Sequence, residues 1–318
     1  MPDTPAIAAP LVPHMIVICI DTESWTNNTD LMTELGMNVF SRQKGREVST
    51  TTGPGPHGVN VMKALNFYHF RIAEHAHLLT NREGSYGPLG NRFGQTRFIT
   101  FQELRVVLEH FFNQDIVSDD PKLQGCKRPV VLIGHALRHD LENANKEGLE
   151  YNFTKYSTIV ANVDTQQLAR QTGVWNPPAY MRTNEIGLRV LVEEKLSFRH
   201  LDDHTAGNDA ARTMMCGIWM CLPAALTQIE HPDMQQVANA VEKHSSLNLA
   251  ALYGTVELCV RCGGRDHSEE ACTVSVQCAA CIRFDTGPNR DQNAASHIET
   301  YCYHTATFKA WARRYKDA

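Results

Sequence analysis

The chain has 318 residues, of which 42% are hydrophobic and 20% are charged, a composition typical of a globular protein with one large domain or two ordinary ones. Its formal net charge of −5 excludes binding to duplex nucleic acid through bulk positive charge. The sequence contains no run of the ~18 apolar residues that span a bilayer and no signal or transit peptide pattern, so we expect an intracellular protein, nuclear or cytoplasmic, without membrane contact.

Strands and helices are predicted to alternate over the first two thirds of the chain. Apolar stretches predict five strands, at 14–20, 31–40, 63–70, 129–134 and 157–163. Helical periodicity and capping signals predict helices at 100–115, 137–147, 165–171, 184–194 and 205–220. The first three strands predict an antiparallel meander, and the polar stretch 41–60 predicts a long loop. We therefore expect an α/β fold with a mixed five-stranded sheet flanked by helices.

A sharp change in composition near residue 250 predicts a domain boundary. We expect one domain over 1–250, with its core at 14–222 and a helical linker at 223–250. Residues 255–318 are rich in Cys, His and Gly, and they predict a small metal-stabilised module that ends in a helix.

The first half of this module has the spacing of a zinc knuckle. Its ligands would be Cys259, Cys262, His267 and Cys272, in a Cys-x2-Cys-x4-His-x4-Cys pattern. Three thiolates and an imidazole form a tetrahedral shell that zinc prefers. Cysteines merely packed in a core are a poor alternative, because the segment has few other apolar residues.

A second set follows and predicts a second knuckle with an expanded loop. Its ligands would be Cys278, Cys281, His297 and Cys302, with His304 as an alternative fourth ligand. We therefore expect one or two zinc ions, the alternative for the second set being a loop cysteine pair without metal.

The C-terminal helix is predicted to carry an aromatic stripe of Phe308, Trp311 and Tyr315. The stripe would pack on the knuckles or contact phosphate or a partner. Because residues 255–318 hold equal numbers of basic and acidic residues, the module is suited to binding a protein as well as single-stranded nucleic acid.

Carboxylates form the other chemical pattern. Asp21 and Glu23 are two residues apart at the end of the first strand, so their side chains point to the same face and could bind Mg²⁺ or Mn²⁺. Taken alone, this pair is also compatible with a solvated strand end. Asp140 on a helix after a buried strand, and His204 followed by Asp209 at a helix start, extend the pattern.

This order of motifs resembles the DEDD exonuclease superfamily of ribonuclease H-like fold, in its histidine subclass. The phrases that carry the resemblance are IDTE, GHALRHDLE and HTAGNDA, within residues 14–222. One departure is Ala136, where many family members have Asn after the histidine of the second motif. With the C-terminal knuckles, the chain is also similar to a fungal group that includes an Argonaute-interacting exonuclease of small-RNA silencing.

The resemblance implies a role for each carboxylate. Asp21, Glu23, Asp140 and Asp209 would hold two Mg²⁺ or Mn²⁺ ions, and His204 would take a proton from the attacking water. Trp25 would stack on the terminal base or belong to the core, and Thr22 is a further candidate substrate contact.

The sequence is compatible with two functions of different kinds. The first is a two-metal 3′–5′ exonuclease that hydrolyses the ends of single-stranded nucleic acid, RNA more than DNA, with an Argonaute or other protein as a partner. The second is a non-catalytic adaptor that uses the ribonuclease H-like platform and the knuckles to bind nucleic acid or protein.

Overall fold

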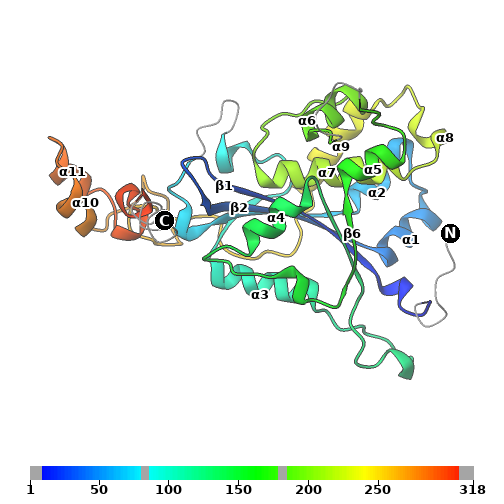
Figure 1. Cartoon of the computed structure of the whole chain (residues 1–318), viewed down its shortest axis with the longest axis horizontal. Helices are drawn as coiled ribbons and strands as arrows, with labels where there is room; N and C mark the ends of the chain where they lie inside the picture. Colours follow the sequence, from blue (N-terminus) through cyan, green and yellow to red (C-terminus); the bar gives the residue numbers. More distant parts are fainter. Residues whose placement is uncertain (1–8, 80–85, 178–184, 308–318) are drawn as a thin grey trace.

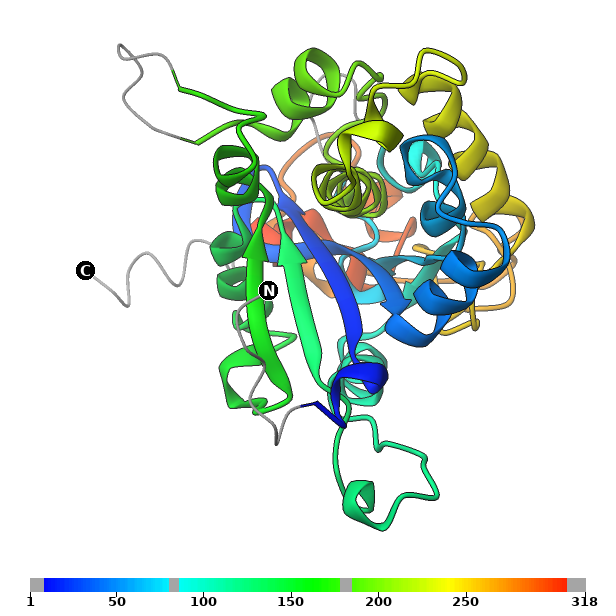
Figure 2. The same cartoon turned by 90° about the vertical axis from the view of Figure 1, so that its right-hand side faces the viewer.

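The structure is a computed structural model, and it describes residues 9–79, 86–177 and 185–307. A mixed sheet runs through the centre of the main domain (Figures 1 and 2). Its strands are β1 (Ile16–Trp25), β2 (Asn28–Ser41), β3 (Asn66–Ile72), β4 (Thr96–Ile99), β5 (Val130–Gly134) and β6 (Ile159–Asp164). The order across the sheet is β4-β3-β2-β1-β5-β6, with β2 antiparallel to both of its neighbours and the other pairs parallel.

Helices lie on both faces of this sheet. The α-helices of the described residues are α1 (Arg42–Thr51), α2 (Val59–Lys63), α3 (Phe101–Phe112), α4 (Leu137–Ala144), α5 (Thr165–Gln171), α6 (Leu188–Val190), α7 (Ala206–Met220), α8 (Ala224–Thr227), α9 (Met234–Leu247), α10 (Ala279–Phe284) and α11 (Arg290–Ala294). Figure 2 shows α7 above the sheet and α3 below it. The helices α10 and α11 belong to the C-terminal segment, at one end of the molecule (Figure 1).

Each face of the sheet has its own hydrophobic core. On one face, Leu104, Leu108 and Phe111 of α3 pack against Ile18 of β1 and Leu35 of β2. On the other face, residues of α2, α5, α7 and α9 pack around Cys19 of β1. This is the three-layer ribonuclease H-like arrangement expected from the sequence, because buried strands such as β1 require apolar cover on both sides.

Local signals explain why α3 begins where it does. Thr100 accepts a hydrogen bond from the Glu103 amide, and the Glu103 carboxylate accepts one in return from the Thr100 amide. This reciprocal capping box satisfies two of the amides that a helix leaves free at its start.

Two predictions for the sheet region were wrong. The stretch 41–60, predicted as a loop, contains α1 and the start of α2. In α1 only Val48 is buried, so the apolar periodicity that marks a helix is missing, and the Ser41 cap on Lys44 stabilises its start. The sheet has six strands instead of five, because β4 has only four residues, too few to show a period.

The segment after α7 packs closely on the main domain. Met234, Val237 and Val241 of α9 are buried in the second core. The domain boundary near residue 250 stays a prediction. The predicted aromatic stripe at 308–315 lies outside the described residues. In the part of the chain that the structure covers, no helix is long and apolar enough to cross a membrane.

Candidate active site and Cys/His module

The five residues to which the resemblance assigns metal-binding or base roles line one cavity of about 570 Å³. Asp21 and Glu23 come from β1, Asp140 from α4, Asp209 from α7 and His204 from the loop before α7. Residues separated by almost 190 positions thus meet at the end of β1, where the first turns of α4 and α7 approach the sheet. The tertiary structure brings all four carboxylates and the histidine together around one space.

A glycine allows α7 to come this close to the sheet. Gly36 of β2 lies opposite Asp21 in the ladder, and a Cβ atom at Gly36 would lie 1.9 Å from the carbonyl oxygen of Ala206. Any side chain at this position would push the start of α7 away from β1. Gly36 therefore helps to set the position of Asp209 relative to Asp21.

Glu23, His204 and Asp209 form the tightest part of the cluster. Each offers a ligand atom, and these atoms lie within 4.8 Å of one another. The Nδ1 atom of His204 is 3.4 Å from Oε1 of Glu23, and the His204 amide donates a 3.0 Å hydrogen bond to Oδ2 of Asp209. His204 has a φ of 58°, a left-handed conformation that costs energy for a non-glycine residue and is common at functional sites.

Asp140 is held by Thr22, which the sequence predicted as a substrate contact. The amide and the hydroxyl of Thr22 both donate 2.8 Å hydrogen bonds to Oδ1 of Asp140, and Asn143 donates to the Thr22 hydroxyl. The Thr22 residue is only 8% exposed. The observed contacts of Thr22 therefore fix the orientation of Asp140.

The electrostatics of the cavity fit divalent cations. Burial, and then the negative charges of Asp140, Asp209, Glu23 and Glu34, raise the pKa of Asp21 well above its ordinary value. Burial raises the pKa of Asp140 to about 7 against the opposing hydrogen bonds from Thr22.

One carboxylate oxygen also lacks a partner. Within the described residues, Oδ2 of Asp21 is buried and accepts no hydrogen bond. Crowded carboxylates and an unpaired acceptor are what Mg²⁺ or Mn²⁺ would satisfy, because hard cations prefer oxygen ligands.

Trp25 belongs to the core. The residue is 3% exposed and packs with Leu31, Leu78 and Ala306, so its ring is not available to stack on a substrate base. Of the two alternatives left by the sequence, the structure therefore selects the apolar one.

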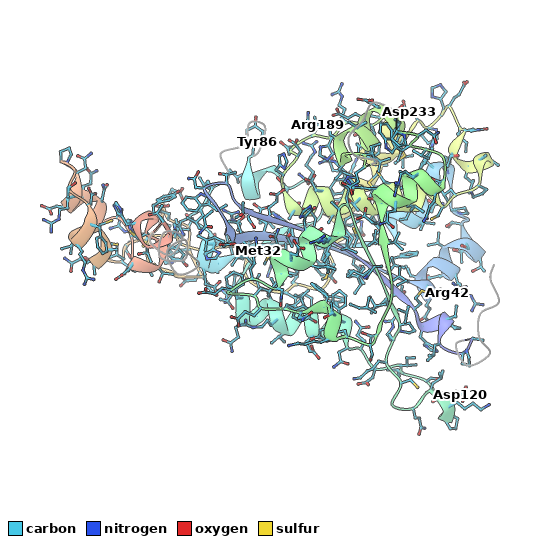
Figure 3. The ribbon with its side chains drawn as sticks, in the orientation of Figure 1. Met32, Arg42, Tyr86, Asp120, Arg189 and Asp233 are labelled. Carbon is cyan, nitrogen blue, oxygen red and sulfur yellow. The ribbon has the colours of Figure 1, made fainter. Side chains whose placement is uncertain are left out.

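Sequence reasoning missed the residues that support Asp209. His200 is almost completely buried, and its Nε2 atom lies 3.3 Å from Oδ1 of Asp209. Arg212 lies one turn further along α7, with its NH1 atom 3.7 Å from the same oxygen. A further polar residue, Asp203, pairs with Arg189, which is labelled in the upper helical layer of Figure 3.

A buried ionic group under the start of α7 was also missed. Glu34 of β2 accepts a 3.1 Å hydrogen bond from the Ala206 amide, lies 2.9 Å from Nε2 of His69 and pairs with Arg71 at 2.8 Å. Burial acts to raise the pKa of Glu34, but the interactions with His69, Arg71 and the Ala206 amide hold this pKa below its ordinary value. Glu34 stands in an apolar stretch of the sequence, where a single acid gives no signal of its partners.

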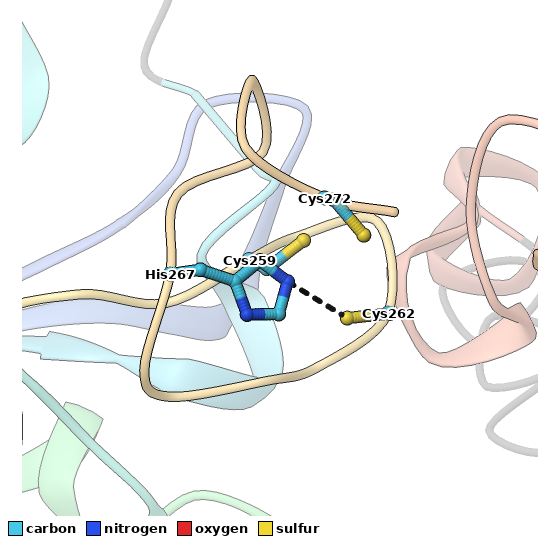
Figure 4. A group of neighbouring side chains, drawn as sticks. All are labelled: Cys259, Cys262, His267 and Cys272. Atoms are coloured by element: carbon cyan, nitrogen blue, oxygen red, sulfur yellow. Dashed lines mark hydrogen bonds between the residues drawn. The ribbon is translucent and has the colours of Figure 1, made fainter. Parts of the chain in front are cut away.

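The first Cys/His set of the module (residues 255–307 of the described chain) is assembled as predicted from its spacing. The ligand atoms of Cys259, Cys262, His267 and Cys272 lie within 4.8 Å of one another (Figure 4). The Nε2 atom of His267 is 3.4 Å from Sγ of Cys262. Its other ring nitrogen lies 2.7 Å from Asp266, the kind of contact that orients a metal-binding imidazole.

The second set is assembled in the same way. Cys278, Cys281, His297 and Cys302 also place their ligand atoms within 4.8 Å of one another. His297 therefore occupies the position for which His304 was the alternative. The three cysteines are almost fully buried, and with two alanines they form the whole apolar cluster of this half. So small a core requires a staple, and the donor set fits zinc.

One family model covers most of the main domain. A family model described as "DEDDh_C: DNA polymerase III subunit epsilon-like, C-terminal domain" matches residues 16–220, which include all five cavity residues. No curated protein matches the chain. Among solved structures, the chain is similar to the zinc ion bound form of an E. coli ExoI–ssDNA complex, with 13% identity and a TM-score of 0.34. The match covers 71% of this chain and 42% of that chain, so this chain spans less than half of that protein.

Proposed function

The chain belongs to the DEDDh exonuclease family, and on that premise we propose that it is a divalent-metal-dependent 3′–5′ exonuclease. Its substrate would be the free end of a single-stranded nucleic acid, RNA more than DNA. The observation that carries the proposal is that Asp21, Glu23, Asp140, Asp209 and His204 line one cavity.

The carboxylates would hold two Mg²⁺ or Mn²⁺ ions in this cavity. When bound, these ions supply positive charge at the scissile phosphate and make a water more acidic. Asp21 and Glu23 project from β1, while Thr22 orients Asp140 and His200 lies against Asp209. The protein's part is to hold these oxygens in place before the substrate arrives.

His204 would act as the general base. Its side chain is 39% exposed, so water and substrate can reach the ring. Its Nδ1 atom is close to Glu23, and a neutral imidazole there can take the proton from the attacking water while the carboxylate stabilises the resulting imidazolium. The proton then leaves to solvent through the exposed side of the ring.

An acidic net charge is compatible with this activity. A long basic groove is needed to bind duplex along its length, whereas trimming an end requires only a pocket and the charge of the cations. Lys146 and Asn143 at the cavity wall add one cationic and one polar side chain.

The activity is tested with 5′-labelled single-stranded RNA and DNA of the same sequence in Mn²⁺. We expect a ladder of products shortened from the 3′ end, faster on RNA, which is lost in an Asp21→Ala, Glu23→Ala double variant. The matched control is Asp119→Ala, Asp120→Ala, which removes two exposed carboxylates elsewhere. If the active-site variant cleaves as fast as wild type, this site is not the source of the cleavage and the enzyme assignment is removed.

The C-terminal module would bind about two zinc ions per chain as tandem CCHC knuckles. The combination of a DEDDh domain with these knuckles supports membership of the fungal group that includes an Argonaute-interacting exonuclease. Metal analysis of the purified chain tests the zinc content, and co-purification with an Argonaute tests the silencing role. An absence of zinc would remove the knuckle assignment.

A further inference from the structure

The Cys/His module lies against the end of the sheet that carries the catalytic carboxylates (Figure 1). Trp25, two residues after Glu23, packs with Leu78 and Ala306, and its ring centroid is 6.2 Å from that of Tyr303. Tyr303 directly follows Cys302, a member of the second Cys/His set. The contact therefore joins the zinc-type cluster to the strand that carries Asp21 and Glu23.

The strand is irregular just where the module touches it. The register between β1 and β2 shifts between Glu23 and Ser24 and again between Ser24 and Trp25. Such irregularities interrupt the ladder of hydrogen bonds locally. The direction of the Glu23 side chain consequently depends on what fixes Trp25, and the module supplies part of that contact.

A second chain of contacts leads from the same tyrosine to α7. The Tyr303 hydroxyl donates a 2.6 Å hydrogen bond to the carbonyl of His77. The adjacent carbonyls of Ala76 and Leu78 accept from Arg71. Arg71 pairs with Glu34, which accepts the Ala206 amide at the start of α7. Tyr303 is thus linked, through intervening residues, to both the β1 and the α7 sides of the cavity.

The arginines of the module make contacts within the chain. Arg265 forms two hydrogen bonds to Glu103 at the start of α3, 2.7 and 3.0 Å long. Arg261 and Arg290 donate to the carbonyls of Val274 and Ile282. Three of the four arginines in residues 255–307 therefore donate intramolecular hydrogen bonds, and the fourth, Arg283, lies over the Phe284 ring. These contacts favour a supporting role for the module over capture of phosphate.

We propose that Tyr303 is a positioning residue for the carboxylate site, and that zinc in the second Cys/His set acts through it. Bound zinc fixes Cys302 and so Tyr303. Tyr303 then holds Trp25 and the His77 carbonyl, which keep Glu23 and the start of α7 in the geometry that binds the catalytic cation. This inference rests on the proposed function, because it assigns the module a role in that same site.

The test measures Mn²⁺ binding to the full chain directly, from the electron paramagnetic resonance signal of free Mn²⁺, next to cleavage over a range of Mn²⁺ concentrations. Tyr303→Ala should weaken Mn²⁺ binding about 10-fold, as loss of an outer contact to metal ligands does, and its cleavage should recover at saturating Mn²⁺. Tyr303→Phe keeps the ring and loses only the hydroxyl, so its effect should be intermediate. Phe284→Ala, another exposed aromatic of the module, is the control and should match wild type.

A second variant approaches the contact from the other side. Trp25→Leu keeps an apolar side chain in the main domain and leaves every residue of the module unchanged. It should weaken Mn²⁺ binding with the zinc content unchanged, which separates positioning from a loss of zinc.

The outcomes distinguish the two proposals. Wild-type affinity for Mn²⁺ in both Tyr303→Ala and Trp25→Leu overturns the positioning role and leaves the proposed function intact. A wild-type chain that neither binds Mn²⁺ nor cleaves overturns the proposed function, and the positioning role with it.

Discussion

The two kinds of proposed metal-binding cluster in this chain are assembled over very different distances along the sequence. The ligands of the first Cys/His set lie within 14 residues, 259–272, and those of the second within 25 residues, 278–302. The carboxylate cluster, in contrast, joins residue 21 to residue 209. The module has little core of its own beyond its cysteines. The carboxylate site stands on a sheet with a hydrophobic core on each face.

The Cys/His module and the carboxylate site differ in the source of the free energy that holds their ligands together. A short cysteine-rich segment gains its structure from the metal, since its ligands cannot be held together otherwise. The carboxylates are held together by the surrounding fold. Burial, and then the repulsion from neighbouring carboxylates, raise the pKa of Asp21 and Asp140. We therefore expect zinc to be required for folding of the module. At the carboxylate site, we expect the metal only to offset the repulsion between buried negative charges.

The largest expected effect is on the module. Removing zinc with a strong chelator should abolish hydrogen-exchange protection over residues 258–307, because structural zinc contributes on the order of 10 kcal/mol to such folds. Protection in β1, β5 and α7 should persist. Loss of hydrogen-exchange protection throughout the chain would show that the main domain depends on zinc as well, which would contradict the proposed difference between the two clusters.

Asp140→Asn should separate activity from folding at the carboxylate site. We expect cleavage to fall by about 10³-fold, since charge stabilisation by the cations amounts to several kcal/mol. Stability at pH 8 without added divalent metal should not fall, because the substitution removes a buried negative charge and keeps an acceptor for Thr22. Thermal unfolding measures the stability of the variant. A strongly destabilised variant would contradict the view that the negative charge of Asp140 is unfavourable without metal.

Glu34→Gln should destabilise the main domain by about 3 kcal/mol, because it leaves Arg71 buried without a charged partner. Urea unfolding measures the effect. The exposed pair Lys44–Glu47 provides the control, and Glu47→Gln should cost under about 0.5 kcal/mol.

The effect of Glu34 should also depend on pH. Its pKa is lower in the folded protein than its ordinary value of 4.5, so the ionised form stabilises the fold above that pH and the contribution is lost as the pH falls. The difference between wild type and Glu34→Gln should therefore shrink below about pH 4.5. A difference that stayed constant down to pH 3 would mean that the charge of Glu34 does not matter.

The smallest expected effect concerns Ala136, where the chain departs from the usual Asn. Ala136 has a φ of 57°, a left-handed conformation that Asn adopts more readily than Ala. Ala136→Asn should therefore raise the free energy of unfolding by about 0.5 kcal/mol, and Ala136→Val should lower it by more than that. If both substitutions destabilise equally, the backbone conformation of Ala136 is not the cause.

Much of the fold could be predicted because its signals are local. The apolar runs of β1 and β5, the capping box at Thr100 and Glu103, and the cap of Asp164 on α5 can each be recognised in a few consecutive residues. The predictions failed where the local apolar pattern is weak. Polar α1 buries only Val48, and the four residues of β4 are identified as a strand by their pairing with β3.

The candidate sites divide in the same way. Ligand types and short spacings along the chain predict both Cys/His sets, with His304 left as an alternative to His297, and the family resemblance predicts the carboxylates and His204. Only the tertiary structure decided that Trp25 is core, that Thr22 orients Asp140, and that Glu34 and Gly36 set the position of α7. These roles depend on contacts between side chains that are distant in sequence, and such contacts form only when the whole chain is folded.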